Sequence, residues 1–290
     1  MLISNLIYIN MLFKKLRIIN TKIERILFFI FKKIQFQLTF PKKKKILFSN
    51  KKDWIKRIKI GFKFTNQVIA FEDFSRGNIM NYDLVIPLTI EDLLFLSEVD
   101  FIKNNPIPIP KKKSILLCHD KSLFNQTLID GGFGKYIPNI NKNMHFPYIL
   151  KKKIDIFGEN SHIIYKPSDE KKYSEIILNY DYFKQELISG TSEYATHILF
   201  KNHKIIYALN IKYVFENEFP IKGKDKPIYT KISFCPYLDI FSSILELIDF
   251  EGLCCFNYKI KDNIPKIFEI NPRFGGSLSL YFFDLLKYLK

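Results

Sequence analysis

The chain has 290 residues, of which 47% are hydrophobic, so it is long enough to bury a sizeable core. Its formal net charge is +16, which indicates attraction to anions such as nucleotides, anionic lipids or acidic glycans, or simply a lysine-rich composition. The four cysteines form no CxxC pair and the five histidines have no metal-ligand spacing, so no zinc site is predicted. A reduced, cytoplasmic setting is therefore expected.

Residues 1–44 are apolar and basic, with seven Lys and Arg between positions 11 and 36. The longest run there without a polar residue is 26–31, far below the ~20 residues that span a bilayer. No small-residue cleavage site follows, which argues against a secretory signal. The pattern predicts a basic amphipathic helix and a lysine-rich linker. One interpretation is that the helix lies peripherally on the inner face of an anionic membrane or packs on a partner. The alternative is a helix that packs on the protein's own body, or a partly disordered extension.

Residues 45–115 alternate between strand-like and helix-like patterns, which predicts a small α/β domain with a parallel sheet. No Gly-x-Gly-x-x-Gly and no Gly-Lys-Ser/Thr motif is present, so neither a dinucleotide fold nor a P-loop is expected. Strands are predicted at 46–48, 67–71, 83–87 and 114–118, and a helix at 90–99.

The most informative stretch is 268–277, with the sequence Phe-Glu-Ile-Asn-Pro-Arg-Phe-Gly-Gly-Ser; it follows a strand-like run at 252–260 and a turn at 261–265. Because alternate residues of a strand share one face, Glu269 and Asn271 are expected to point the same way. A carboxylate and an amide oxygen on one face suit Mg²⁺ held with nucleotide phosphates, and the nearby Arg273 suits an oxyanion. A solvated surface hairpin is the alternative interpretation.

Together with pieces in matching order upstream, this motif makes residues 45–290 resemble the ATP-grasp superfamily. The most similar members are short, stand-alone carboxylate–amine ligase-like proteins and the carbamoyl-phosphate synthetase large subunit. The resemblance implies an α+β, ATP-grasp fold at 116–290, in which two α+β subdomains grip ATP. The small α/β domain at 45–115 and the amphipathic segment at 1–44 are expected to precede it.

The resemblance also implies which residues hold the ATP phosphates. Lys121 belongs to an Asp-Lys pair and Lys151 ends an apolar strand at 146–151, both as in the family. Gly158 and Ser161 lie where the family has a Gly/Ser-rich loop that folds over the phosphates. This chain departs from that pattern, since it has one Gly there, so a plain hairpin turn is the alternative.

The segment 182–190 matches the family's interdomain hinge. The resemblance therefore implies that the backbone at Glu186, Leu187 and Ile188 contacts adenine. It also implies that Glu193 accepts hydrogen bonds from both ribose hydroxyls, which suits a carboxylate. A plain hairpin with exposed glutamates is the alternative.

For the metal, the resemblance implies that Glu269 and Asn271 hold Mg²⁺, or Mn²⁺, between the phosphates. Asn257, twelve residues before Glu269, is expected to assist. Many family members have an acidic residue or Gln at that position, so both one-ion and two-ion sites stay open. Arg273 and Lys151 are the expected catalytic residues, stabilising the transferring phosphoryl group.

The activity implied is an ATP-dependent ligase that joins a carboxylate to an amine through an acyl phosphate and releases ADP and phosphate. The carboxylate is expected to be a small molecule or glycan-linked, as in surface-glycan or secondary-metabolite biosynthesis. The alternatives are a non-ligase phosphotransferase and a catalytically degenerate nucleotide- or anion-binding protein. Nucleic acid is not an expected partner, because the basic residues do not interleave with aromatic residues in one patch. No oligomeric state is predicted.

Overall fold

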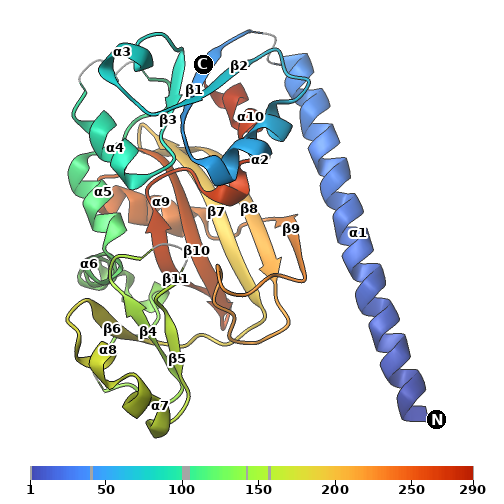
Figure 1. The fold of residues 1–290 in the computed structure, drawn as a ribbon, viewed down its shortest axis with the longest axis vertical. Coiled ribbons are helices and arrows are strands. Elements are labelled where there is room, and N and C mark those ends of the chain that lie inside the picture. The colour runs from blue at the N-terminus through green and yellow to red at the C-terminus, as the bar shows by residue number, and fades with distance from the viewer. Residues whose placement is uncertain (1, 40–41, 100–104, 142, 156–157, 290) are drawn as a thin grey trace.

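The computed structural model describes residues 2–39, 42–99, 105–141, 143–155 and 158–289, with side chains from residue 15 onward. The described residues form three sheets, and one long helix, α1 (Leu2–Thr39), runs along the outside of the body (Figure 1). Both helices and strands are well represented, as the predicted α+β class requires.

The first sheet is parallel, with the strand order β2-β1-β3, as the alternating pattern predicted. The central strand is buried at four of its five positions, which explains its apolar sequence. Helix α4 begins at a capping box in which Thr89 and Asp92 bond each other's backbone. The elements are β1 (Lys45–Ser49), α2 (Lys52–Phe62), β2 (Val68–Glu72), α3 (Arg76–Ile79), β3 (Leu84–Ile86) and α4 (Ile90–Ser97).

The strand predicted at 114–118 is wrong, because these residues belong to helix α5 (Lys112–His119). Ser114, Ile115 and Cys118 are buried, whereas Leu116 is 45% exposed, so one side of a helix packs on the body. A run of four apolar residues after Ser114 carries no periodicity that separates a buried strand from a buried helix.

The second sheet is antiparallel, with the order β5-β4-β6, and lies beyond α5 and α6 in the lower part of Figure 1. Asp120 caps α6 by accepting from the backbone N–H groups of Ser122 (2.9 Å) and Leu123 (3.0 Å). The elements are α6 (Lys121–Leu128), η2 (Ile129–Phe133), η3 (Gly134–Tyr136), β4 (Tyr148–Lys152), β5 (His162–Ile164), α7 (Pro167–Lys172), α8 (Ser174–Leu178) and β6 (Tyr182–Glu186).

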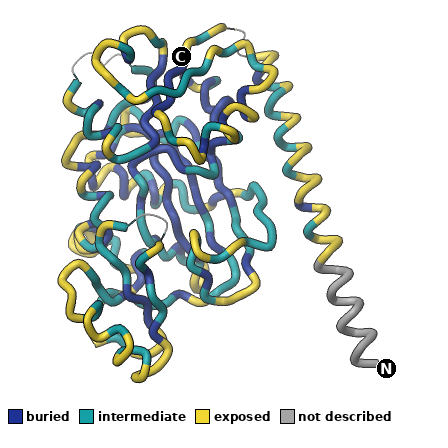
Figure 2. The backbone as a smooth tube through the Cα atoms, in the orientation of Figure 1, coloured by how far each residue is buried: buried dark blue, intermediate teal, exposed yellow. Residues whose placement is uncertain are grey.

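The third sheet is the largest, an antiparallel sheet of five strands in the order β11-β10-β7-β8-β9. One face packs against α9, and the other packs against the first sheet and the C-terminal segment. Figure 2 shows that its strands form the buried centre of the molecule. The elements are β7 (Ser192–Lys201), β8 (Lys204–Val214), β9 (Tyr229–Ser233), α9 (Leu238–Leu247), β10 (Gly252–Lys261), β11 (Ile264–Asn271), η4 (Gly276–Leu278), α10 (Phe282–Leu285) and η5 (Leu286–Tyr288).

The turn between β10 and β11 is shorter than predicted. Lys261 pairs with Ile264, so only Asp262 and Asn263 remain outside the strands. Both have positive φ, at 52° and 60°, as a two-residue hairpin turn requires. This turn alone would place Asn257 opposite Phe268. A bulge that leaves Phe268 without a partner in the ladder shifts the register, so that Asn257 faces Glu269 across the two strands.

Helix α1 packs on the body through its C-terminal half. Phe36 is 1% exposed and lies edge-on to Phe283, and the Lys32 ammonium is 3.0 Å from a carboxylate oxygen of Asp284. Among the described residues, no helix combines the length and apolar character that crossing a membrane requires.

Candidate functional site

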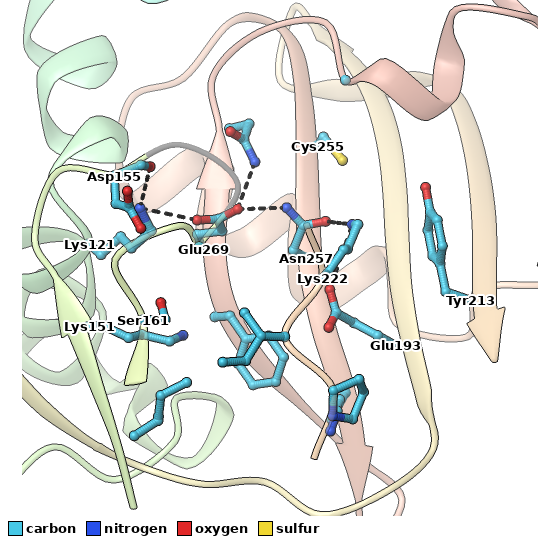
Figure 3. Close-up of a pocket in the computed structure, with 18 of the residues that line it drawn as sticks. Lys121, Lys151, Asp155, Ser161, Glu193, Tyr213, Lys222, Cys255, Asn257 and Glu269 are labelled. Carbon is cyan, nitrogen blue, oxygen red and sulfur yellow. Dashed lines mark hydrogen bonds and ion pairs between the residues drawn. The ribbon is translucent and has the colours of Figure 1, made fainter. Parts of the chain in front are cut away.

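A cavity of about 340 Å³ lies between the second and third sheets, and helix α2, which follows the first strand of the first sheet, contributes to its wall (Figure 3). The hinge from β6 to β7 crosses from one sheet to the other along its edge. All twelve site residues predicted from the sequence line this cavity. They are Lys121, Lys151, Gly158, Ser161, Glu186, Leu187, Ile188, Glu193, Asn257, Glu269, Asn271 and Arg273. Their individual roles stay predictions.

The Glu269 carboxylate is the centre of a polar network. One oxygen accepts from the side-chain amides of Asn257 (2.9 Å) and Asn271 (3.1 Å), and the other is 3.4 Å from the Lys121 ammonium (Figure 3). Burial by itself would raise the pKa of Glu269, but Lys121 and Lys151 outweigh it and lower the pKa to about 2. The alternation predicted for this strand is confirmed, since Ile270 points to the core and is 1% exposed.

Two lysines from separate elements stand on the side of the second sheet. Lys121, in the first turn of α6, donates to the backbone oxygen of Asp155 (2.8 Å). Lys151, on β4, lies over the Phe268 ring at 4.7 Å. Burial lowers the pKa of Lys151 to about 8, although Glu269 opposes the shift. These two ammonium groups suit a polyphosphate, because its negative charge would compensate for the water that they lose on burial.

Lys222 is a third cation in the cavity, and it was not among the predicted site residues. Its ammonium is 2.5 Å from the Asn257 amide oxygen, 3.7 Å from a Glu193 oxygen and 4.6 Å from the centre of the Tyr213 ring. Burial raises the pKa of Glu193 even though Lys222 opposes it, so this carboxylate is held in a dry part of the wall.

Lys259 is a further cation of the cavity that was not predicted as a site residue. It is 3% exposed, and it donates to the backbone oxygens of Ile188 (2.9 Å) and Glu218 (3.1 Å). Burial lowers its pKa to about 8. The alternation of β10 could have revealed it, because Lys259 follows Asn257 by two residues and therefore shares its face.

Gln185 offers an unpaired amide beside the hinge. It is 1% exposed and lines the cavity, and neither its amide nitrogen nor its oxygen has a partner among the described residues. A buried amide without partners is costly unless a ligand bonds it. The neighbouring Glu186 side chain is instead bonded to Lys261 (2.6 Å) and to the backbone N–H of Asn139 (3.0 Å).

The segment expected to cover the phosphates connects β4 to β5, and its residues 156–157 lie outside the described part. Gly158 has a φ of +67°, which favours glycine. Ser161 is buried, and its backbone oxygen accepts from Lys224 (2.7 Å). This contact holds the segment against the loop that carries Lys222.

Arg273 and the Gly-Gly-Ser turn line the end of the cavity next to α2. Arg273 is 8% exposed and lies 5.7 Å from the centre of the Trp54 ring, and burial lowers its pKa. The buried His197 bonds the Ser277 hydroxyl through Nε2 (2.6 Å), and burial lowers its pKa to about 3, which keeps the ring neutral. Cys255 lines the cavity, whereas its neighbour Cys254 lies in the core behind the sheet, because successive residues of a strand point to opposite faces.

The cavity has few candidate metal ligands. Among the described residues, no three His, Cys, Asp or Glu side chains come together. Glu269 with the amides of Asn257 and Asn271 makes a set of one carboxylate and two neutral groups. Such a set fits Mg²⁺, which commonly takes one or two carboxylates and completes its shell with substrate phosphates and water.

No protein-family model matches the sequence, and no curated protein matches it either. Solved structures do match the fold. Phosphoribosylamine–glycine ligase from Thermotoga maritima has a TM-score of 0.61 and 12% identity, over 81% of this chain and 70% of that one. L-amino acid ligase from Bacillus licheniformis has a TM-score of 0.58 and 11% identity, over 82% and 69%. D-alanine–D-alanine ligase from Bacillus anthracis has a TM-score of 0.55 and 13% identity, over 85% and 97%.

Fold and site together define an α+β protein in which two antiparallel sheets enclose a cationic cavity along a hinge. The chain has the ATP-grasp fold that its motifs predicted.

Proposed function

We propose that the protein is an ATP-dependent ligase that joins a carboxylate to an amine. The main support is the convergence of four lysines, from α6, β4, β10 and the Lys222 loop, on one hinged cavity that also holds the Glu269 carboxylate. The solved structures with similar folds include D-alanine–D-alanine ligase, L-amino acid ligase and phosphoribosylamine–glycine ligase, which also supports a ligase. The localisation that we propose is the cytoplasm, where ATP is available and the four free cysteines stay reduced.

In this proposal the polyphosphate lies between Lys121 and Lys151 on one wall and Lys222 on the other. Burial lowers the pKa of Lys151, whereas Tyr213 and Glu193 raise the pKa of Lys222 against the effect of its burial. Both amines are partly withdrawn from water, so an anionic ligand gains more from them than from exposed lysines. The segment with Gly158 and Ser161 would exclude water over the phosphates.

At the hinge, the adenine would lie beside Leu187 and Ile188, with the unpaired Gln185 amide available to bond its edge. Glu193 would accept from the ribose hydroxyls. The buried Glu193 carboxylate lies 3.7 Å from the Lys222 ammonium in the free protein, so both side chains are already positioned to meet a nucleotide.

The residues fit a divalent cation only when phosphate oxygens share it. Mg²⁺ or Mn²⁺ would be held by Glu269 and Asn271, with Asn257 turning its oxygen inward, and would neutralise phosphate charge. Glu269 is ready for this role, because its pKa of about 2 keeps it ionised at neutral pH.

The chemical step needs little covalent help from the protein. A substrate carboxylate would attack the γ-phosphorus and release ADP, and an amine would then displace phosphate from the acyl phosphate. Arg273, near the Gly-Gly-Ser turn, would stabilise the transferring group by charge. The basic surface supports an anionic substrate, such as a glycan-linked carboxylate.

The first test is calorimetric titration of Mg·ATP into the wild type, Glu269→Ala and the control Glu175→Ala. Glu175 lies on the exposed side of α8, outside the cavity. Binding that needs Mg²⁺ and is lost only in Glu269→Ala supports the site. Equal binding by wild type and Glu269→Ala would rule out the assigned metal residue.

The second test is ADP release with pairs of carboxylates and amines, followed by mass spectrometry of the product. An amide product supports the ligase. A phosphorylated product without an amide indicates a phosphotransferase instead, and nucleotide binding without turnover across the screen favours a degenerate binding protein.

A further inference from the structure

Helix α1 has two opposite apolar faces, and only one of them is covered. The inner face contacts the body through Phe28 and Phe29, which lie 5.9 and 6.1 Å from the Tyr281 ring. Arg25 donates to the Thr230 hydroxyl (2.5 Å), and Lys32 pairs with the buried Asp284. These contacts fix which way the rest of the helix points.

The outer face is an apolar stripe in which Asn20 and Gln37 are the polar members among the described side chains. At 100° per residue, its side chains span about 140° of the helix circumference, centred opposite the inner face. Each apolar member is between 47% and 79% exposed. The apolar members of this outer stripe are Leu16, Ile19, Ile23, Ile26, Leu27, Ile30, Phe31, Ile34 and Leu38.

The surroundings of the outer stripe are strongly basic. Between residues 15 and 39 the only acidic residue is Glu24, whereas Lys15, Arg17 and Lys22 are exposed beside the stripe. The lysine run 42–45 follows the helix.

The neighbouring loop extends the same surface. The side-chain amide of Gln37 donates to the backbone oxygen of Phe64 (2.9 Å), which places Phe64 beside the end of the stripe. Phe64 is 77% exposed. Lys33 donates to the backbone oxygen of Lys63 (2.8 Å), which brings another basic residue to the border.

We propose that the outer stripe of α1 binds the surface of an anionic lipid bilayer. The apolar side chains would enter the boundary between headgroups and acyl chains, and the flanking lysines would pair with lipid phosphates. The helix would lie in the plane of the bilayer, with the body attached through the inner face.

A second copy of this chain is the competing occupant, and the observations argue against it. Pairing two such helices would bring basic borders together with almost no carboxylates to oppose them, on chains that each carry a net charge of +16. A stripe about 140° wide also exceeds the seam that a two-helix coiled coil covers.

The test is flotation of the full chain with vesicles of phosphatidylcholine alone and of phosphatidylcholine mixed with phosphatidylglycerol. The variant is Leu27→Glu with Ile30→Glu, at the centre of the stripe. The control is Leu178→Glu, a single substitution of the same type at a residue that is 86% exposed on α8. All three substituted residues are exposed, so each variant should keep the thermal midpoint of the wild type, which verifies that it is folded.

We expect flotation with the mixed vesicles only, weakened at high salt, and reduced about ten-fold or more in the double variant but not in Leu178→Glu. Absence of flotation, or equal flotation of the wild type and the double variant, would overturn the proposal. So would a lipid-free, concentration-dependent dimer that the double variant abolishes, since that result assigns the stripe to a second copy.

Discussion

Replacing Gly275 by alanine should destabilise the protein and disturb the cavity. Gly275 has a φ of −99°, which any residue adopts, so the cost comes from space alone. A Cβ there would lie 2.9 Å from Nδ1 of His197 and closer still to its Cε1, and 3.3 Å from Cβ of Cys255. His197 is fully buried and bonded to Ser277, so it has little room to retreat.

The magnitude follows from that overlap. Forcing one extra methyl group into a packed interior costs about 1–3 kcal/mol, and for a chain of this size each kcal/mol lowers the midpoint by roughly 2 °C or more. Displacing His197 also moves Ser277 and the neighbouring Arg273, so Mg·ATP affinity should fall.

The assay is thermal and denaturant unfolding of Gly275→Ala beside Gly77→Ala. A Cβ at Gly77, within α3, meets nothing within 4 Å, so that variant should be neutral or gain up to about 1 kcal/mol. In a His197→Ala background the cost of Gly275→Ala should shrink, because the ring that it strikes is gone. A Gly275→Ala protein as stable as the wild type, with the same nucleotide affinity, would refute the reasoning.

Three further outcomes are expected. Mg·ATP should bind about ten-fold more weakly at about pH 9 than at pH 7, because Lys151 has a pKa of about 8 and is deprotonated over that range; calorimetry of Lys151→Met should show most of this dependence gone. The free energy of unfolding should fall as pH drops from 4.5 towards 2, by up to about 3 kcal/mol from Glu269, whose lowered pKa stabilises the fold only while it is ionised; acid titration of Glu269→Gln should lack that part. Denaturant unfolding of Asp284→Ala should show a loss of about 3–5 kcal/mol, because Lys32 and Lys287 lose a buried partner. An unchanged stability would mean that the Lys32–Asp284 ion pair does not help to hold α1 on the body.

Local pattern was sufficient for the elements that carry the site. The alternation of β11 predicted that Glu269 and Asn271 share a face and that Ile270 is buried, and the structure confirms the arrangement. This outcome depends on the strand period, which is a property of neighbouring residues. The pairing of Asn257 with Glu269 depends in addition on a bulge at Phe268 that shifts the register, and hairpin length alone does not give it.

The sequence pattern could not decide where two kinds of secondary structure or packing produce the same local pattern of apolar residues. The apolar run at 114–118 fits a strand or a buried helix equally, and contacts with the body decided for the helix α5. For residues 1–40 the sequence allowed packing on the body or on a membrane. Only the structure showed that one face of α1 is used for packing and that the opposite apolar face is left exposed.

The sequence by itself determined the order of the motifs, the faces of their strands and the chemistry of each side chain. The tertiary structure alone decided which charges meet. Lys121 reaches Glu269 across 148 positions of chain, and Lys222 reaches Asn257 from a loop with no pattern of its own. Such pairs form because two sheets close around a hinge, and the packing of distant segments, not any local period, sets that closure.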